Sequence, residues 1–269
     1  MPHLVVIDTY CLLHMVSDAV TRYGVHPDKV ESFVNCQLIC ASSLDWLGSL
    51  KRADSAVVFS VDDKTVPYWR KDLYPEYKGN RAKKEQFEYV KSRSLTVLER
   101  LSTKCFGVPS QESDDIIAGI CRVKPADVTV TIATVDTDLL GLVLESDGER
   151  CGVNWFSLSD RWQPRYRDTL AVINEWALKR HSIILEKPSD IWAFKCQYGD
   201  ASDNLPPGTP SYMIDLNNPH PAHDILNNAK ALAEITSCFD VKAYRHPRVE
   251  EAANWLRRHG YRQTLATYS

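Results

Sequence analysis

Short apolar runs alternate with amphipathic segments through the first 160 residues of the chain. The runs are rich in β-branched residues, as buried strands are, and they cover Leu4–Ile7, Ala56–Phe59, Val128–Thr134 and Val153–Leu158. This alternation predicts an α/β fold with a mainly parallel central sheet flanked by helices. The predicted helices cover residues 12–20, 28–47, 87–101, 113–120, 139–144, 168–180, 189–198, 222–237 and 248–259. We therefore expect an α/β core over 1–185 and a helical part over 186–269.

Composition and patterning exclude several classes of protein. Apolar residues make up 44% and charged residues 25% of the chain, as in ordinary globular proteins. No apolar run approaches the ~20 residues that span a bilayer, and the N-terminus lacks the basic start of a signal peptide. The eight cysteines include no C-x-x-C pair, so we expect reduced thiols and no zinc ribbon. These features predict a cytoplasmic protein without a membrane partner.

Acidic residues follow three of the predicted strands. They are Asp8, Asp62, Asp63, Asp136 and Asp138. Because parallel strands end at one edge of a sheet, these carboxylates are expected to converge there. Two further groups lie at predicted helix ends, and they are Glu112, Asp114, Asp115, Asp200 and Asp203. Any one of these acids could instead cap a helix or form a turn.

Convergence of so many carboxylates predicts a metal site. Unpaired like charges at ~4 Å repel by several kcal/mol at an intermediate dielectric, and a bound cation removes that cost. Hard oxygen ligands suit Mg²⁺, for which Mn²⁺ can substitute. The acids outnumber the ligands that one ion needs, and two ions ~3.5–4 Å apart match phosphodiester chemistry.

A basic, aromatic segment follows the second predicted strand. Residues 64–104 hold eleven Lys or Arg against five acids, and the interleaved rings are Tyr68, Trp69, Tyr74 and Tyr77. Bases and rings together favour binding of single-stranded nucleic acid. A solvated basic face is the alternative interpretation. The net charge of −3 excludes only a uniformly basic nucleic-acid binder.

Five stretches, in this order, resemble the 5′-nuclease family. They are LVVIDTYCLLH (4–14), VVFSVDDKTVPYWRKDLYPEYKGNR (57–81), ESDDIIAGI (112–120), TIATVDTDLLGLV (131–143) and KPSDIWAFKCQYGDASDNLPPG (187–208). The family includes the nuclease domain of bacterial DNA polymerase I, flap endonucleases and small phage 5′→3′ exonucleases. The resemblance covers about residues 4–208, and YPEYKGNR and GDASDN are its most specific motifs.

The resemblance implies a role for each acidic and basic residue in these motifs. The first metal cluster would comprise Asp8, Asp63, Glu112 and Asp114, with Asp115 beside them. The second would comprise Asp136, Asp138, Asp200 and Asp203. Asp63 fits the family spacing to Arg70 and Lys78 better than Asp62, which we interpret as a bystander. Lys78 and Arg81 match the catalytic basic pair that contacts the scissile phosphate. DNA contacts are expected from Arg70, Tyr77, Lys78, Arg81, Lys83 and Lys84.

The implied activity is hydrolysis of DNA near a 5′ end by two Mg²⁺ ions. The substrate would be a 5′ flap or a single-strand/duplex junction, with a helical arch over about 64–104 admitting the single strand. Exonuclease and flap activities both remain open, as does an RNA–DNA primer as substrate during replication or repair. The chain has no room for a polymerase, so we expect a freestanding, monomeric, phage-like nuclease.

Other functions were weighed against this one. A catalytically inactive nucleic-acid-binding relative is the main alternative. A ribonuclease of a smaller metal-dependent fold would not need YPEYKGNR or GDASDN. An aspartyl phosphohydrolase would need D-x-D at the first strand, where Asp8 is followed by Thr9 and Tyr10. No P-loop motif occurs.

The chain departs from the family in three places. After GDASDN it reads LPPGTPSYMIDLNNP, with no glycine pair after Gly208, so the helix–turn–helix is atypical and the family's K⁺-assisted duplex anchor is in doubt. Only Ala82–Lys84 separates YKGNR from the next helix, which predicts a short arch. The last 60 residues match nothing in the family. The basic residues there could form a DNA-facing helix or a solvated amphipathic one.

Overall fold

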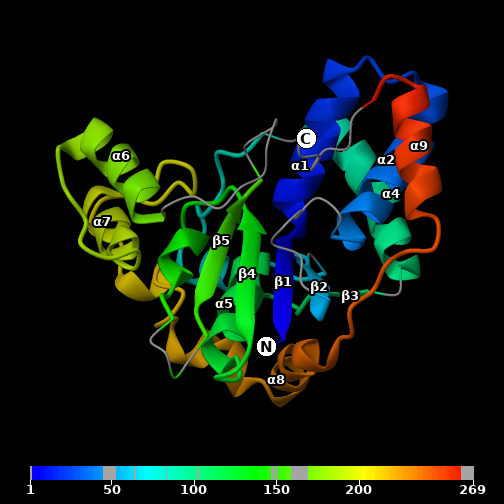
Figure 1. Cartoon of the computed structure of the whole chain (residues 1–269). Coiled ribbons are helices and arrows are strands. Elements are labelled where there is room, and N and C mark those ends of the chain that lie inside the picture. The colour runs from blue at the N-terminus through cyan, green and yellow to red at the C-terminus, as the bar shows by residue number, and fades with distance from the viewer. Residues whose placement is uncertain are drawn as a thin grey trace.

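A computed structural model describes residues 2–44, 53–63, 65–82, 84–101, 103–146, 149, 151–158 and 169–261. Its centre is a five-stranded sheet in which every neighbouring pair is parallel. The strands lie in the order β3 (Lys104–Phe106), β2 (Ser55–Ser60), β1 (His3–Asp8), β4 (Thr129–Thr134) and β5 (Val153–Ser157). The predicted parallel α/β sheet is confirmed, and Figure 1 shows its strands rising toward one edge.

Helices cover both faces of this sheet, which explains why every residue of β1, β2 and β4 is buried. Val5 and Ile7 of β1 face one side and Leu4 and Val6 the other, because successive side chains alternate along a strand. The first side packs on α1 (Thr9–Arg22), α2 (Val30–Ser42), α4 (Glu85–Arg100) and α9 (Val249–Arg258). The second packs on α5 (Ser113–Val123), α6 (Thr169–His181), α7 (Asp190–Tyr198) and α8 (Ala229–Thr236).

The C-terminal helices return to the core instead of forming a separate one. Helix α9 lies against α2, and its Val249, Ala252 and Leu256 are buried in the same cluster as β1. Helix α8 packs on α5, where a Cβ on Gly119 would come within 2.7 Å of Ile235. The predicted division at residue 185 is therefore not a break in the hydrophobic core. The expected helix over 248–259 is present and amphipathic.

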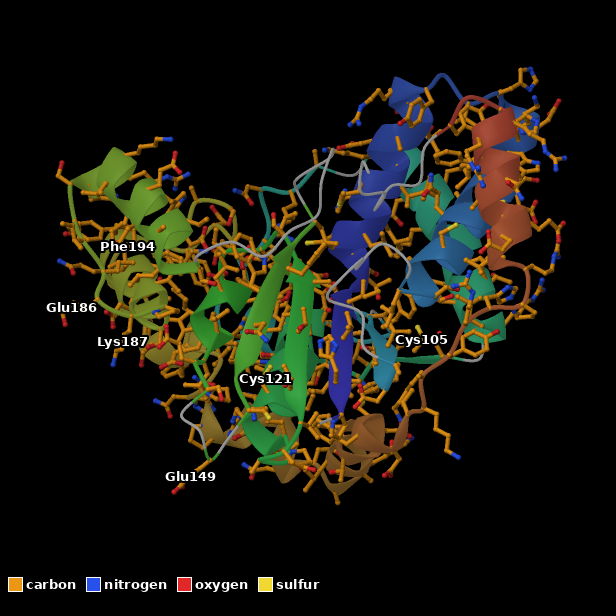
Figure 2. All side chains as sticks on the ribbon, in the orientation of Figure 1. Cys105, Cys121, Glu149, Glu186, Lys187 and Phe194 are labelled. Carbon is orange, nitrogen blue, oxygen red and sulfur yellow. The ribbon has the colours of Figure 1, made fainter. Side chains whose placement is uncertain are left out.

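Helices α6 and α7 form a pair at one end of the sheet (Figure 1). Their shared core centres on Phe194, whose ring lies 5.1 Å from that of Trp176 and 4.9 Å from that of Tyr198. Figure 2 shows Phe194 inside this pair, whereas Glu186 and Lys187 lie at its outer edge. This packing holds α7, and the segment that follows it, against the carboxyl edge of the sheet.

Three local features differ from the sequence-based expectation. The segment predicted as a loop over 64–84 contains a short helix, α3 (Trp69–Leu73). Strand β3 was not predicted, because its three residues are only half-buried. Residues 205–228 contain only 3₁₀ turns before α8, so a second long helix of the expected helix–turn–helix is not formed there.

All eight cysteines lie in the described part of the chain and none is disulfide-bonded. Figure 2 shows Cys105 on β3 and Cys121 on α5 well apart. Across the described residues, no helix is both long and apolar enough to span a membrane.

Candidate active site

The ends of β1 and β4 bring two predicted ligands together. Thr134 donates from Oγ1 to Oδ2 of Asp8 at 2.8 Å, and the Cys11 amide donates to Asp8 Oδ1 at 3.3 Å. The Asp136 amide in turn donates to Thr134 Oγ1 at 2.9 Å. Burial raises the pKa of Asp8; hydrogen bonds from Cys11 and Thr134 oppose the rise, and repulsion from Asp136 adds to it. The carboxylates at this edge therefore lie close enough to repel each other.

The first turn of α5 adds two more acids. Glu112 is the N-cap of this helix and forms a capping box with Asp115, which fixes the turn at the sheet edge. Burial and then repulsion from Asp136 raise the pKa of Asp114 well above its ordinary value. Asp8, Asp114 and Asp136 thus form one electrostatically strained group. Among the described residues, none of these three carboxylates forms an ion pair with Lys or Arg.

Asp115 and Arg70 form a buried ion pair instead of facing a metal and DNA. Arg70 Nη1 and Nη2 each donate to Asp115 at 2.8 Å, and Arg70 Nε donates to the carbonyl of Met213 at 2.9 Å. Both carboxylate oxygens of Asp115 are thereby occupied. Arg70 is 3% exposed, which differs from its expected DNA contact, because α3 carries it into the core. Its charge offsets Asp115 and Glu112.

Tyr77 and Lys78 point inward to the acids. The Tyr77 hydroxyl lies 2.8 Å from Glu112 Oε2 and 2.9 Å from Asp203 Oδ2, and its ring is 3% exposed. This burial differs from the nucleotide stacking expected of Tyr77. Lys78 forms an ion pair with Glu112, and its Nζ lies 3.6 Å from Asp203 Oδ2.

Arg81 and Lys84 are the exposed members of the predicted DNA-binding set. Arg81 Nη2 lies 2.5 Å from Asp203 Oδ1, while 53% of its side chain remains exposed. Lys84 is exposed just before α4. Lys83 lies outside the described residues. Arg81 therefore combines a carboxylate partner with access to solvent, as a phosphate contact at this edge requires.

The YPEYKGNR and GDASDN motifs are joined by hydrogen bonds to backbone carbonyls. The Lys78 amide donates to the Asp203 carbonyl and the Asn80 side chain to the Ala201 carbonyl, both at 2.9 Å. In return, Asn204 Nδ2 donates to the carbonyl of Glu76 at 2.9 Å. This reciprocal docking fixes the basic residues of one loop against the acids of the other.

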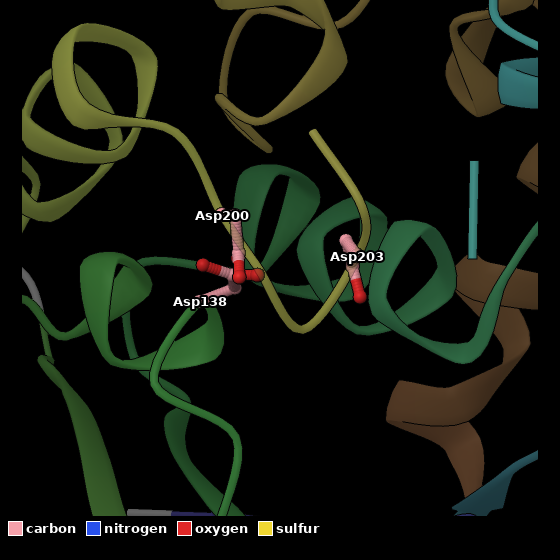
Figure 3. Close-up of side chains that lie close together, drawn as sticks. All are labelled: Asp138, Asp200 and Asp203. Atoms are coloured by element: carbon pink, nitrogen blue, oxygen red, sulfur yellow. The ribbon is translucent and has the colours of Figure 1, made fainter. Parts of the chain in front are cut away.

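Asp138, Asp200 and Asp203 form the one carboxylate group, among the described residues, with the spacing of a metal site. One oxygen from each lies within 4.8 Å of the others (Figure 3). Hard oxygen donors at this spacing fit a divalent cation. The pKa of Asp138 is raised to about 7. Burial is the largest cause, Lys195 opposes the rise, and repulsion from Asp136 and Asp200 adds to it.

Lys195 was not predicted from the sequence. Its Nζ lies 2.5 Å from Asp138 Oδ1 and 2.7 Å from Asp200 Oδ2. It is 3% exposed. The feature that could have indicated Lys195 is its position on a predicted helix, one turn before Gly199. A side chain at that position lies near the acids of GDASDN.

Asp62 and Asp63 are placed differently from each other. Asp63 accepts from the Thr65 amide and hydroxyl at 2.8 and 2.6 Å in an exposed turn. Asp62 accepts from the Ser113 amide and the Tyr68 hydroxyl, both at 2.7 Å. Asp62 therefore anchors the start of α5, between Glu112 and Asp114, and its place outside the metal cluster stays a prediction. The ligand role of Asp63 stays a prediction.

The family described as 5′-3′ exonuclease, N-terminal resolvase-like domain, matches residues 3–168. The chain belongs to the 5′-3′ exonuclease family. The carboxylates that follow β1 and β4 and those at the start of α5 lie within the matched range, whereas Asp200 and Asp203, which follow α7, lie beyond it.

Curated members of the 5′-3′ exonuclease family share about a quarter of their residues with this chain. The thermostable DNA polymerase I of Thermus thermophilus is 28% identical over 162 residues, which are 60% of this chain and 17% of the polymerase. The 5′-3′ exonuclease of Mycoplasmopsis pulmonis is 27% identical over 187 residues, 69% of this chain and 56% of that protein. The chain thus spans less than two thirds of the curated relatives it matches here.

The fold is also found in a solved structure. The T5 5′-exonuclease with divalent zinc ions bound superposes with a TM-score of 0.50 and 16% identity, over 98% of this chain and 95% of that one. At this identity the likeness concerns the fold alone.

Proposed function

We propose that this protein is a metal-dependent 5′ nuclease that hydrolyses DNA phosphodiesters near a free 5′ end. The observation that carries the proposal is the convergence of Asp8, Glu112, Asp114, Asp136 and the Asp138–Asp200–Asp203 group at one sheet edge. Basic residues from YKGNR border these acids. Two divalent cations, Mg²⁺ in the cell, would activate water for attack on phosphorus and offset charge on the phosphate.

The chain's own residues then have separate tasks. Asp8, Asp63, Glu112 and Asp114 would hold one cation. Asp136, Asp138, Asp200 and Asp203 would hold the other, and the last three of these have the spacing of a metal site. Lys78 and Arg81 would donate to the non-bridging phosphate oxygens, releasing Glu112 and Asp203 as they do so. Tyr77 would orient Glu112 and Asp203, because its hydroxyl lies within hydrogen-bond distance of both carboxylates.

The 5′ polarity and the DNA substrate are supported by relatives. A flap endonuclease of bacteriophage T5 has been solved in a pseudo-enzyme-product complex with DNA and metal ions, and its fold matches with a TM-score of 0.50. We also propose that the protein is a monomer and acts in the cytoplasm. An RNA–DNA primer is a further substrate to test, together with the flap.

The deciding experiment is cleavage of a 5′-flap duplex, a blunt duplex and an RNA–DNA primer duplex, each labelled at both ends, with Mg²⁺ or with EDTA. We expect Mg²⁺-dependent cutting near the 5′ end and none in EDTA. The Asp136→Ala variant should bind the flap but not cut it, since it removes a cation ligand without touching the basic residues. Retained binding without cutting by the wild-type protein would instead support the inactive relative.

A further inference from the structure

A hollow lined by tyrosines and prolines lies beside the candidate active site. Its volume is about 180 Å³. An engineered cavity of about 150 Å³ binds benzene, so the hollow has room for one aromatic ring. Tyr74 lies three residues before Tyr77, and Leu205 lies two residues after Asp203, so the lining continues into both loops that carry the site. We call it the Tyr74–Tyr212 hollow, and it is lined by Leu73, Tyr74, Tyr212, Met213 and residues 205–210.

The lining of this hollow carries no charged side chain. The stretch 196–229, which supplies most of it, contains no Lys or Arg at all. A phosphate therefore finds no basic partner there, although phosphates bind proteins mainly through Lys and Arg. Leu73 is 42% exposed, and Pro206, Pro207 and Pro210 are exposed as well. Covering this apolar surface with a neutral aromatic group is favourable, because it removes the surface from water.

The loop that forms one part of the hollow is held in place by its own backbone. Leu205 and Asp200 exchange two backbone hydrogen bonds, at 2.8 and 2.9 Å, and the Gly208 amide donates to the Cys196 carbonyl at 2.8 Å. Gly199 permits this close approach, since a Cβ there would come within 2.8 Å of the Leu205 carbonyl oxygen. A surface that is already formed loses little conformational freedom when a ligand binds to it.

Positive charge next to the hollow comes from the YPEYKGNR motif. Lys78 Nζ lies 3.6 Å from Asp203 Oδ2, and Arg81 Nη2 lies 2.5 Å from Asp203 Oδ1. Residues 64–104 hold eleven Lys or Arg, in contrast to the stretch 196–229. Proteins that bind single strands combine basic residues for the phosphates with aromatic rings for the bases. A strand whose phosphate contacts Lys78 and Arg81 therefore has the hollow nearby for one of its bases.

We propose that the Tyr74–Tyr212 hollow binds one unpaired nucleobase of the strand that the protein cleaves. This inference rests on the proposed nuclease function and deepens it, because it makes an unpaired nucleotide part of what the protein recognises. Tyr212 presents a fixed ring, since His220 packs edge-on against it with ring centres 5.0 Å apart. A base inside a duplex cannot enter, because its faces are covered by the neighbouring base pairs.

The test is binding of 5′-flap duplexes to the full chain in EDTA, with one nucleotide of the flap at a time replaced by an abasic one. We expect one position near the flap base at which loss of the base weakens binding by about tenfold or more, as loss of a stacked base does. 2-Aminopurine at that position should change its fluorescence when the protein binds. Abasic nucleotides elsewhere in the flap should have a smaller effect.

Variants of Tyr212 connect this effect to the hollow. Tyr212→Leu keeps an apolar side chain but removes the ring, so intact and abasic flaps should bind it almost equally. Tyr212→Phe keeps the ring and should still distinguish them. The matched control is Tyr244→Leu, which changes a half-buried tyrosine outside the lining, between α8 and α9, with a histidine ring edge-on at 6.1 Å. If Tyr212→Leu does not fold, Leu73→Ser takes its place, because Leu73 is exposed.

The outcomes separate this proposal from the proposed function. An equal effect of the abasic nucleotide in the wild type and in Tyr212→Leu, or no effect at any position, would overturn the base site and leave Mg²⁺-dependent cleavage intact. A wild-type dimer that Tyr212→Leu dissociates in sedimentation would make the hollow an interface between copies of the chain. The expected abasic effect without cleavage of any substrate would contradict the nuclease function alone. A protein that binds no nucleic acid would overturn both.

Discussion

Lys78 and Asp203 are joined twice, although they come from distant parts of the chain. The Lys78 amide donates to the Asp203 carbonyl at 2.9 Å, and the Lys78 ammonium lies 3.6 Å from the Asp203 carboxylate. Lys78 has φ +54°, a left-handed conformation that costs a non-glycine residue ~1–2 kcal/mol. The hydrogen bond from the Lys78 amide keeps its side chain beside Glu112 and Asp203. The strained backbone of Lys78 therefore fixes the position of its ammonium.

Replacing that charge should affect catalysis more than binding. Lys78→Ala leaves Arg81 to attract phosphate but removes the donor nearest Glu112. We expect kcat on the flap to fall by about 10²-fold or more, with little change in Kd, because the donor acts on developing charge. Single-turnover cleavage and binding isotherms test this. Lys230→Ala, an exposed lysine on α8, should change neither. Equal losses in kcat and affinity for Lys78→Ala would make Lys78 a steering residue only.

Asn204 should contribute more to the free energy of unfolding than one side-chain hydrogen bond does. It has φ +58°, which asparagine tolerates, and its side chain donates to the Glu76 carbonyl at 2.9 Å. Asn204→Ala loses both advantages and should cost ~1–2 kcal/mol of the free energy of unfolding. Asn204→Gly keeps the conformation and should cost less. Urea denaturation measures both, with the exposed Asn217→Ala as a neutral control; a larger loss for glycine than for alanine would refute the backbone argument.

The buried Arg70–Asp115 pair should tolerate no loss of one partner. Arg70→Met leaves Asp115 without its cation and Glu112 with Lys78 alone, and it should destabilise the fold by ~3–5 kcal/mol. Arg70→Lys keeps the charge but not the bidentate geometry, so its stability should lie between those of the wild type and Arg70→Met. Denaturant unfolding compares them with Arg258→Met, an exposed change on α9. A near-wild-type Arg70→Met would mean that Asp115 is protonated or otherwise paired.

The Arg122–Asp224 pair predicts a pH dependence away from the site. Arg122 donates to both Asp224 oxygens at 2.9 and 2.7 Å; burial raises the pKa of Asp224, but these bonds and the Leu226 amide hold it below its ordinary value of 3.8. The unfolded chain therefore takes up a proton before the folded one does. The pair stabilises the fold above about pH 4, and this contribution is lost as the pH falls through the lowered pKa.

Asp224→Asn should thus be less stable than the wild type near pH 7, and the difference should shrink as the pH falls below 4. Urea unfolding at pH 3, 4, 5 and 7 gives the profile. The exposed Asp127→Asn serves as a reference. A difference that stays constant over this range would show that the charge of Asp224 contributes nothing.

Strands β1, β2 and β4 were predictable because each contains an apolar run with β-branched residues that helices bury on both sides, whereas the three half-buried residues of β3 were missed. The convergence of acids followed from parallel topology alone. Burial of Arg70 and Tyr77 was not predictable, since their partners, Asp115, Met213 and Asp203, come from distant segments and a basic, aromatic stretch suits a solvated surface equally well. Lys195 was missed for the same reason, because its carboxylates lie on two different elements.

The hydrogen bonds between the YPEYKGNR and GDASDN motifs also determine which part of the chain forms a complete unit. The family match ends at residue 168, yet the amide of Lys78 finds its acceptor at Asp203, and Glu76 finds its donor at Asn204. A fragment that ended at residue 168 would keep all five strands but lose Asp203 and Asn204, the partners of Lys78 and Glu76. In any longer polypeptide that carries this site, the segment that contains Lys78 must therefore be kept together with the segment that contains Asp203 and Asn204.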